Sequence, residues 1–317
     1  MTWQPCAGLE AVRERALIYR QIRAFFNNRG CLEVDTPLLL SSTNTDPQVE
    51  PLAVSLEQRI AYLQTSPEFA MKRLLAAGSG SIFQICHAFR QGEAGRRHHP
   101  EFSLLEWYRV GYDYRRLMDE MELLITTLNL KQCRFDRITY HDLFARHLNV
   151  DLEAIDLDSL RRLCDERVAG SNSGDLDFDQ CLDLLLGMAI APSLEGYQFV
   201  YDYPVSQAAL ARRKTGDARV AERFELFYDG LELANGFSEL VDADEQRTRF
   251  EQDNALRRRR QLPQYELDEN LLAALAAGLP ECAGVALGLD RLLMVLLDLD
   301  SIEQVLTFTD QPWGSGR

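Results

Sequence analysis

Two hairpin signals constrain the fold of this chain more than any other feature of its sequence. Residues 81–90 and 101–109 alternate as strands do, and a short loop rich in Gly and Arg separates them. Residues 221–227 and 231–237 flank Asp229-Gly230, a dipeptide typical of a tight hairpin turn. Strands joined this closely run antiparallel. We therefore predict an α+β fold built on a mostly antiparallel sheet.

Helical patterns surround these strands. Residues 9–29 carry apolar side chains on one face, and two further helices are expected at 242–260 and 268–277. The segment 114–196 is also mostly helical in pattern, and we interpret it as a helical insertion. The expected organisation is one domain over residues 1–317, with helices flanking the sheet.

The charge and cysteine content narrow the classes of function. The chain has 317 residues, with 34 Lys and Arg against 49 Asp and Glu, which leaves a net charge of −15. This acidity argues against broad, non-specific binding to nucleic acid. The seven cysteines include no C-x-x-C pair, which favours free thiols in a reducing compartment. With no leader-like N-terminus and no apolar run of membrane length, we expect a cytoplasmic protein without a membrane partner.

A basic loop is the first candidate site. Residues 89–102 gather three arginines, two histidines and two aromatic rings within an acidic protein. A guanidinium can grip phosphate oxygens through two hydrogen bonds, and an aromatic ring can stack on a base. The same pattern would also suit an exposed basic turn, or a loop whose histidines bind a metal.

Two further segments complete the candidate site. Residues 225–239 place several carboxylates in an otherwise apolar hairpin, where buried carboxylates need a cation such as Mg²⁺ or a substrate ammonium. Salt bridges to the arginine-rich run 257–260 are the alternative. Residues 284–291 offer glycines that permit a close approach of the backbone, followed by an arginine at a helix start.

Together these segments predict a polyphosphate gripped by Arg90, His98 and Arg291, with a metal ion on carboxylates. A cationic organic substrate would lie near further carboxylates such as Glu68 and Glu106. The glycines do not form the G-x-x-x-x-G-K-[ST] pattern of a Walker loop.

The motifs, in this order, resemble those of the class II aminoacyl-tRNA synthetases, in particular the lysyl branch. Residues 29–37 are similar to motif 1, whose proline (Pro37 here) lies at a dimer interface, and residues 90–102 are similar to motif 2. Residues 235–240 match the lysyl branch almost letter for letter, and residues 284–291 resemble motif 3. The resemblance implies a class II catalytic domain that uses ATP and Mg²⁺ and forms a homodimer.

The resemblance also implies roles at the ATP end of the site. Arg90 would bind the α-phosphate, and Arg90 and Arg291 would be the catalytic residues. The remaining expected ATP contacts are His98 and Arg291 at the γ-phosphate, Phe102 stacked on adenine, Gly288 where the adenosine approaches the backbone, and Leu233 and Glu232. Glu225 and Glu232 would bind Mg²⁺. Motif 2 usually carries a glutamate where this chain has Gly92, so the next residue, Glu93, is expected to contact adenine or the loop.

Another set of residues is expected to bind the amino acid. Ser66, Glu68 and Glu106 would line the site for the amino group near the carboxyl. Tyr108 and Glu239 would take the distal ammonium, and Asn235 the carboxylate. Ala286 stands where the synthetases have glycine, and its methyl group would reshape the pocket in favour of a β-amino acid.

Motif 1 begins about thirty residues into the chain, so we expect no anticodon-binding domain before it. A lysyl-type catalytic domain of this kind resembles the branch that modifies a protein instead of tRNA. That branch activates lysine, preferably (R)-β-lysine, and transfers it to the ε-amino group of a lysine on elongation factor P. A minimal tRNA-charging ligase and an inactive regulatory paralogue remain alternatives, although tRNA is the less expected partner.

Overall fold

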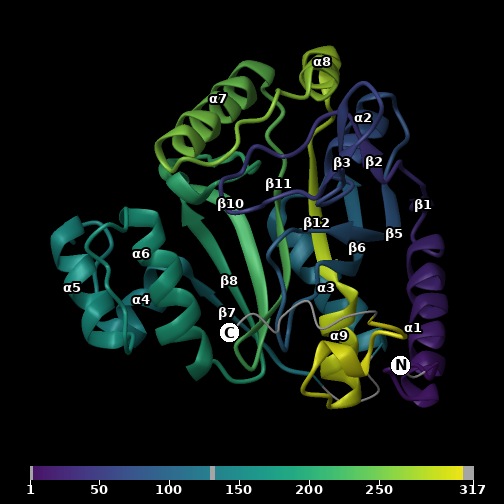
Figure 1. Ribbon diagram of the computed structural model, residues 1–317, viewed down its shortest axis with the longest axis horizontal. Coiled ribbons are helices and arrows are strands. Elements are labelled where there is room, and N and C mark those ends of the chain that lie inside the picture. Colours follow the sequence, from purple (N-terminus) through teal and green to yellow (C-terminus); the bar gives the residue numbers. More distant parts are fainter. Residues whose placement is uncertain (1–2, 129–132, 310–317) are drawn as a thin grey trace.

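One large sheet organises the computed structural model, which describes residues 3–128 and 133–309. The strand order is β1-β5-β6-β12-β11-β10-β8-β7 (Figure 1). Strand β9 pairs with β10. The strands are β1 (Leu32–Glu33), β5 (Ile82–Phe89), β6 (Glu101–Val110), β7 (Phe135–Thr139), β8 (Tyr197–Pro204), β9 (Arg213–Lys214), β10 (Asp217–Tyr228), β11 (Leu231–Ser238) and β12 (Cys282–Gly288). The remaining residues of the predicted 1–317 domain lie outside this description.

The pairing of these strands confirms a mostly antiparallel sheet. Every pairing from β5 to β8 is antiparallel, and the β1–β5 and β7–β8 pairs at the two ends are parallel. Asp229 and Gly230 form the β10–β11 turn with φ of 44° and 73°, which is the left-handed backbone that a tight hairpin turn requires. A small separate sheet joins β2 (Leu39–Leu40), β4 (Ile60–Leu63) and β3 (Ala53–Ser55).

Helices cover both faces of the large sheet. They are α1 (Leu9–Asn27), α2 (Glu68–Ala76), α3 (Tyr114–Leu128), α4 (Tyr140–Leu148), α5 (Leu157–Arg167), α6 (Phe178–Leu185), α7 (Ala243–Arg259), α8 (Glu269–Gly278) and α9 (Leu289–Leu297). Apolar side chains of α1, α3 and α9 share one core with the sheet, and side chains of α2, α7 and α8 share another. The α+β prediction is therefore confirmed, with helices on either side of the sheet.

Alternation along the central strands decides which side chains face the site. On β6, Leu105 and Trp107 are fully buried in the core beneath α1 and α3. Their neighbours Leu104, Glu106 and Tyr108 therefore point to the opposite face, because side chains alternate along a strand. This second face is the one that carries the candidate site.

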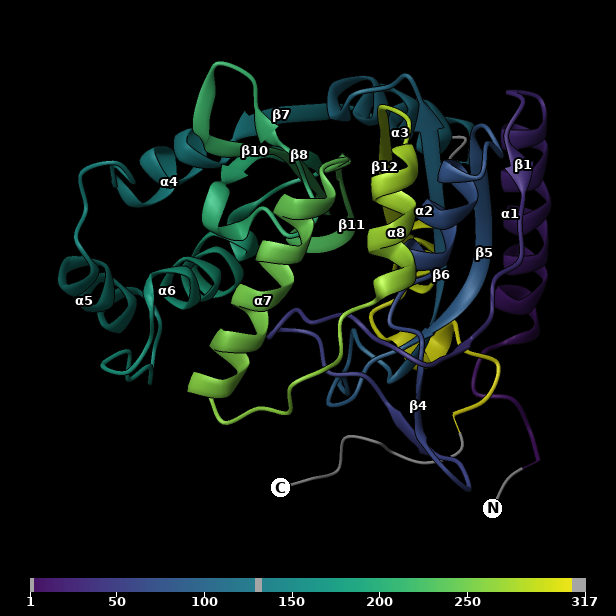
Figure 2. The ribbon, with the colours of Figure 1, turned by 90° about the horizontal axis from the view of Figure 1, so that it is seen from above.

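The segment 114–196 is less uniformly helical than the sequence predicts. Helix α3 packs its apolar stripe into the main core, and residues 135–139 form strand β7, which extends the sheet. Helices α4, α5 and α6 build a second core against β8. Figures 1 and 2 show these three helices on the side of the molecule opposite α1. The division of the chain into one domain with an insertion stays a prediction.

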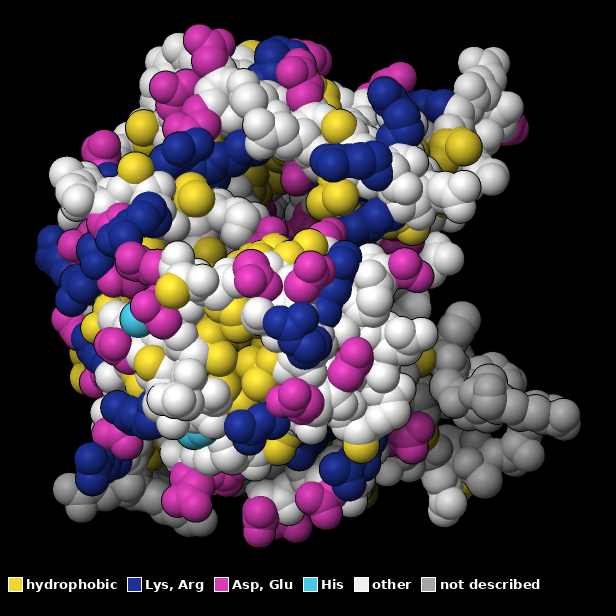
Figure 3. Space-filling model, turned by 90° about the vertical axis from the view of Figure 1, so that its left-hand side faces the viewer, with side chains coloured by type: hydrophobic (Ala, Val, Ile, Leu, Met, Phe, Trp, Pro, Cys, Tyr) yellow, Lys and Arg dark blue, Asp and Glu magenta, His cyan; other side chains and the backbone are white. Residues whose placement is uncertain are grey.

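The face on the left of Figure 1 carries acidic and basic side chains side by side, with a hollow between them (Figure 3).

Among the described helices, none has the length and apolar character needed to cross a membrane.

Candidate active site

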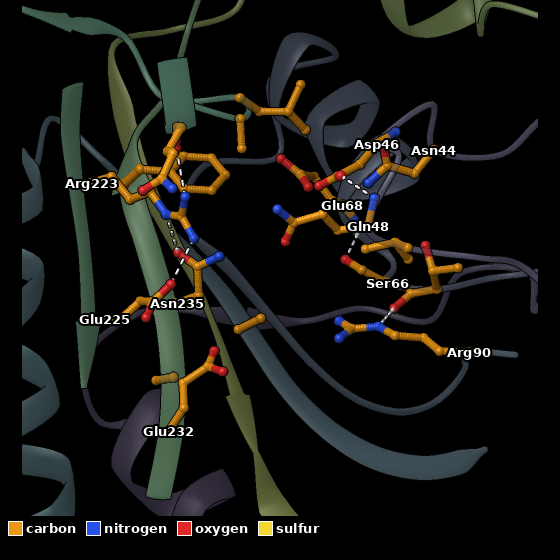
Figure 4. A pocket seen from close by; sticks show the side chains of 18 of the residues that line it. Asn44, Asp46, Gln48, Ser66, Glu68, Arg90, Arg223, Glu225, Glu232 and Asn235 are labelled. Carbon is orange, nitrogen blue, oxygen red and sulfur yellow. Dashed lines mark hydrogen bonds and ion pairs between the residues drawn. The ribbon is translucent and has the colours of Figure 1, made fainter. Parts of the chain in front are cut away.

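A cavity of about 710 Å³ opens on the second face of the sheet. All of the predicted site residues except Glu239 line it: Ser66, Glu68, Arg90, Glu93, His98, Phe102, Glu106, Tyr108, Glu225, Glu232, Leu233, Asn235, Ala286, Gly288 and Arg291. In Figure 4, Glu225, Glu232 and Asn235 project from one wall, and Ser66, Glu68 and Arg90 project from the other. The segments singled out in the sequence therefore meet at one place.

A β-bulge between β10 and β11 aligns one wall. Glu225 pairs with Asn235, whereas Phe227 pairs with Glu232, and the register shifts between them. In a regular strand, residues three apart such as Glu232 and Asn235 would point to opposite faces. The extra residue in the bulge returns both side chains to the face that carries Glu225.

The same register continues across the floor of the cavity. Asn235 pairs with Ala286, and Ala286 pairs in turn with Glu106. Gly284 lies beside Tyr108 in the same way. Side chains on four adjacent strands are thus aligned in rows beneath the cavity.

Glu106 is the central carboxylate of this floor. It is 2% exposed and accepts hydrogen bonds from the Ser66 and Tyr108 hydroxyls, both at 2.7 Å. Burial, followed by the nearby charge of Glu68, raises the pKa of Glu106 to about 7. A cationic ligand would stabilise its ionised form.

Helix α2 brings the second carboxylate. The helix begins at Glu68, directly after Ser66 and Pro67. The Ser66 hydroxyl accepts the Glu68 backbone N–H at 3.1 Å, and it donates its own proton to Glu106. Ser66 thereby links the start of α2 to the floor of the cavity.

Glu239 is the one predicted site residue that does not itself line the cavity. Its carboxylate lies behind Gly284, and the ammonium of Lys72 is 2.6 Å from one of its oxygens. Burial raises the pKa of Glu239, although the charge of Lys72 opposes the shift. The carboxylate predicted for a ligand ammonium thus already faces an ammonium of the protein.

Arg90 and Phe102 lie together at the other end of the cavity. The guanidinium carbon of Arg90 is 5.1 Å from the centroid of the Phe102 ring, and Nη1 is 3.3 Å from an oxygen of Glu93. Gly92 has a φ of 82°, a conformation that glycine adopts without strain. This turn brings the side chain of Glu93 to Arg90, although Glu93 stands one residue after the position where motif 2 usually carries its glutamate.

The loop over this end is fastened to α9. Arg291 donates to the backbone oxygen of Glu232 at 2.8 Å and to that of Arg97 at 3.3 Å. Burial and the charge of Arg291 lower the pKa of His98, so its imidazole is neutral near pH 7. A neutral imidazole can donate one hydrogen bond to a phosphate oxygen.

Glu225 and Glu232 are the two carboxylates predicted to bind Mg²⁺, and both line the cavity. Glu225 is buried, and burial together with the charge of Glu232 raises its pKa, although Arg223 lies 2.6 Å away. Mg²⁺ in proteins often takes one or two carboxylates and completes its shell with phosphate oxygens and water. No cluster of three or more His, Cys, Asp or Glu residues suited to a metal occurs in the described ranges. An ion held by these two glutamates would therefore need phosphate oxygens to complete its shell.

The alternative partners proposed for the hairpin carboxylates are wrong. The side chain of Arg257 is fully buried, donates to the backbone oxygen of Asp46 at 2.8 Å and also pairs with Glu50. Arg260 pairs with Asp177, and both residues line the cavity. Both arginines therefore form ion pairs with segments other than the hairpin.

Three charged residues of the site are not identified by the sequence patterns. Arg223 contacts both Glu225 and Asn235, and its place two residues before Glu225 on one strand was the available signal. Lys72 follows Glu68 by four residues, a spacing that brings side chains together on a helix. Asp290 accepts the Ser103 backbone N–H at 2.6 Å and pairs with Arg15 of α1 at 2.5 Å. The long-range partners of Asp290 have no local signal.

Comparisons with known proteins agree with this geometry. Residues 9–312 match the model of the family described as tRNA synthetases class II (D, K and N). The chain belongs to this family. Proteins from Salmonella dublin and Salmonella paratyphi B (strain ATCC BAA-1250 / SPB7), each named elongation factor P–(R)-beta-lysine ligase, are 48% identical to it, and each match covers 97% of both chains.

The close packing behind Gly284 generates a stability prediction. A Cβ atom at this position would lie 2.3 Å from a ring carbon of Tyr108 and 2.5 Å from an oxygen of Glu239. We expect Gly284→Ala to lower the free energy of unfolding by about 1–3 kcal/mol, because both buried side chains must shift. Chemical denaturation measures this loss.

Gly187 provides the matched control, because a Cβ there would meet nothing within 4 Å. Gly187→Ala should leave stability unchanged or slightly raised. Equal effects of the two substitutions would contradict the packing described for Gly284.

Proposed function

We propose that this protein uses ATP to activate lysine, preferably (R)-β-lysine, and transfers it to the ε-amino group of a lysine on elongation factor P. The observation that carries the proposal is the cavity with two chemically distinct ends. Buried carboxylates suited to ammonium groups occupy one end, and arginines with a carboxylate pair occupy the other. The similarity to the elongation factor P ligases over nearly the whole chain supports this choice of substrates.

The amino acid would bind at the carboxylate end. Ser66, Glu68 and Glu106 would receive the ammonium nearer the carboxyl group, and Tyr108 and Glu239 the distal one. Asn235 would donate its amide N–H to the substrate carboxylate. Because Ala286 lies between Asn235 and Glu106 in the register, its methyl group would limit the space beside the reacting carboxyl and favour the β-amino acid.

The nucleotide would bind at the arginine end. Phe102 would stack on adenine, with Leu233 and Gly288 along the adenosine and Glu93 beside Arg90. His98 and Arg291 would hold the γ-phosphate. Glu225 and Glu232 would hold Mg²⁺, which offsets the phosphate charge when bound.

Chemistry at this site needs no protein nucleophile. The substrate carboxylate attacks the α-phosphorus, the bond to pyrophosphate breaks, and an acyl-adenylate forms. The Arg90 guanidinium would stabilise the charge that develops on the α-phosphate oxygens. The acceptor amine then attacks the acyl carbon and loses a proton, AMP leaves, and an amide remains.

Intact mass spectrometry of elongation factor P tests this function. We expect a gain of one lysyl unit after incubation with the protein, ATP, Mg²⁺ and (R)-β-lysine, and no charging of lysine tRNA in a parallel reaction. Arg90→Ala should slow the modification by about a hundredfold or more, since it removes a charge that acts in the transition state.

Each contrary result has a definite meaning. Charged tRNA with unmodified elongation factor P would identify a tRNA ligase instead. If neither acceptor changes, the protein is an inactive paralogue and the proposed function is refuted.

The raised pKa of Glu106 predicts how substrate binding depends on pH. A carboxyl group with a pKa of about 7 loses its charge as the pH falls below that value. We expect the KM for the diamino acid to rise as the pH is lowered from 8 to 6. Glu106→Gln should raise KM about tenfold at pH 8 and flatten this part of the profile.

Glu101 on the same strand supplies the control, because its side chain is 53% exposed. Glu101→Gln should keep the wild-type profile. A Glu106→Gln profile that superimposes on the wild-type one would exclude Glu106 as the group that binds the ammonium.

We also propose that the protein is a homodimer through residues 29–39, which contain the segment that resembles motif 1. Leu32, Leu38 and Leu39 are 57%, 41% and 44% exposed, although leucine usually lies inside a protein. Strand β1, which contains Leu32, stands at an edge of the large sheet. Exposed leucines beside a sheet edge support association with a second copy.

Sedimentation equilibrium tests the dimer. Leu39→Asp should convert a dimer of the wild-type chain to a monomer, because it buries a charge in an apolar contact. Met188→Asp, at a 63% exposed position in the segment after α6, should remain dimeric. A monomeric wild-type protein would refute the proposal.

A further inference from the structure

A lysine is buried among the carboxylates proposed to bind the amino acid. The Lys72 side chain is 1% exposed, and its ammonium lies 2.7 Å from an oxygen of Glu68 and 2.6 Å from an oxygen of Glu239. The Phe237 ring covers it at 5.5 Å from the ring centroid. The protein thus places one ammonium of its own next to the site for the substrate's ammonium groups.

The charges around Lys72 do not balance. Carboxylates face this cluster from three elements: Glu68 from α2, Glu106 from β6, and Glu239 after β11. Tyr108 on β6 and Cys282 on β12 also face it, and burial raises the pKa of both, so they are neutral. When all three carboxylates are ionised, one ammonium leaves two negative charges without a partner.

A ligand with two ammonium groups would complete the balance. Burying an unpaired charge is costly, whereas paired charges with hydrogen bonds are tolerated. In the described part of the chain, the Glu239 oxygens are buried and without a hydrogen bond that satisfies normal geometry, although Lys72 is close. Gly284 lies between Glu239 and the cavity. Because glycine has no side chain, one oxygen of Glu239 lies close to the cavity wall.

We propose that Lys72 is a positioning residue that supplies a fixed third cation, so that the cluster is neutral only with a ligand carrying two ammonium groups. This inference rests on the proposed function and deepens it. Lys72 acts through the two carboxylates it holds and does not touch the substrate. It therefore sets how many positive charges the amino acid must bring.

Removing this cation would change the protonation of the site. Burial lowers the pKa of Lys72, but Glu239 and Glu68 raise it more, so the ammonium stays charged. Without it, Glu68 and Glu239 would repel each other and retain a proton to a higher pH. A protonated carboxyl group cannot pair with a substrate ammonium, so binding would require a more alkaline solution.

Calorimetric titration with (R)-β-lysine between pH 6.5 and 9 tests the proposal on the full chain. Lys72→Met should weaken binding about tenfold or more at pH 7.5 and move the alkaline rise in affinity upward by about one pH unit. Arg73→Met, at the exposed neighbouring position, should keep the wild-type affinity and profile. A purely structural role for Lys72 would lower stability without moving the pH profile of the folded protein.

A compensated variant keeps the test decisive if Lys72→Met does not fold. Glu68→Gln alone leaves two carboxylates and Lys72, and it should shift preference toward 6-aminohexanoate, which has one ammonium. Lys72→Met combined with Glu68→Gln leaves two carboxylates and no lysine, and it should restore preference for the diamino acid. Equal preference in these two variants would overturn the proposal.

The outcomes separate this proposal from the proposed function. If the wild-type protein binds (R)-β-lysine but does not modify elongation factor P, the proposed function fails and the role of Lys72 is still decided by its variants. If Lys72→Met binds as the wild type does, with the same pH profile, the role of Lys72 alone is refuted. A wild-type protein that binds no diamino acid refutes both.

Discussion

The bulge between β10 and β11 is the constraint on which the geometry of the site depends. It brings Glu232 to the face that already carries Glu225 and Asn235, and the antiparallel register then extends that face to Ala286 and Glu106. A regular hairpin would turn Glu232 into the apolar core beneath the sheet. One extra residue thus determines whether the two ends of the cavity belong to one site.

The two ends of the cavity also share a second property, an excess of buried carboxylates. Glu106, Glu225 and Glu239 are buried, and the pKa of each is raised by that burial. The folded protein therefore carries carboxylates whose charge is only partly offset by Arg223 and Lys72. Ligands that bring cations would relieve this imbalance.

The sequence predicts much of this structure because the relevant signals are local. The alternation of apolar and polar residues, the Asp229-Gly230 turn and the helical patterns identify the strands and helices. The order of the motifs along the chain indicates which residues form the site. Strand β7 and the packing of α3 are less well predicted, because they depend on which surface an amphipathic segment meets. The pairing of Lys72 with Glu239 joins residues far apart in the chain, which no periodicity can indicate.

The contact of Asp290 with Arg15 has a consequence for how the protein is made. These residues are separated by 275 positions. Asp290 also accepts a hydrogen bond from the backbone N–H of Ser103, and the residue after it, Arg291, lies at the phosphate end of the cavity. Contacts of such separation form late, after the entropy of closing a long loop has been overcome. During synthesis, the phosphate end would remain incomplete until α9 leaves the ribosome and meets α1. A nascent chain with most of its sheet in place would therefore still be unable to grip the polyphosphate.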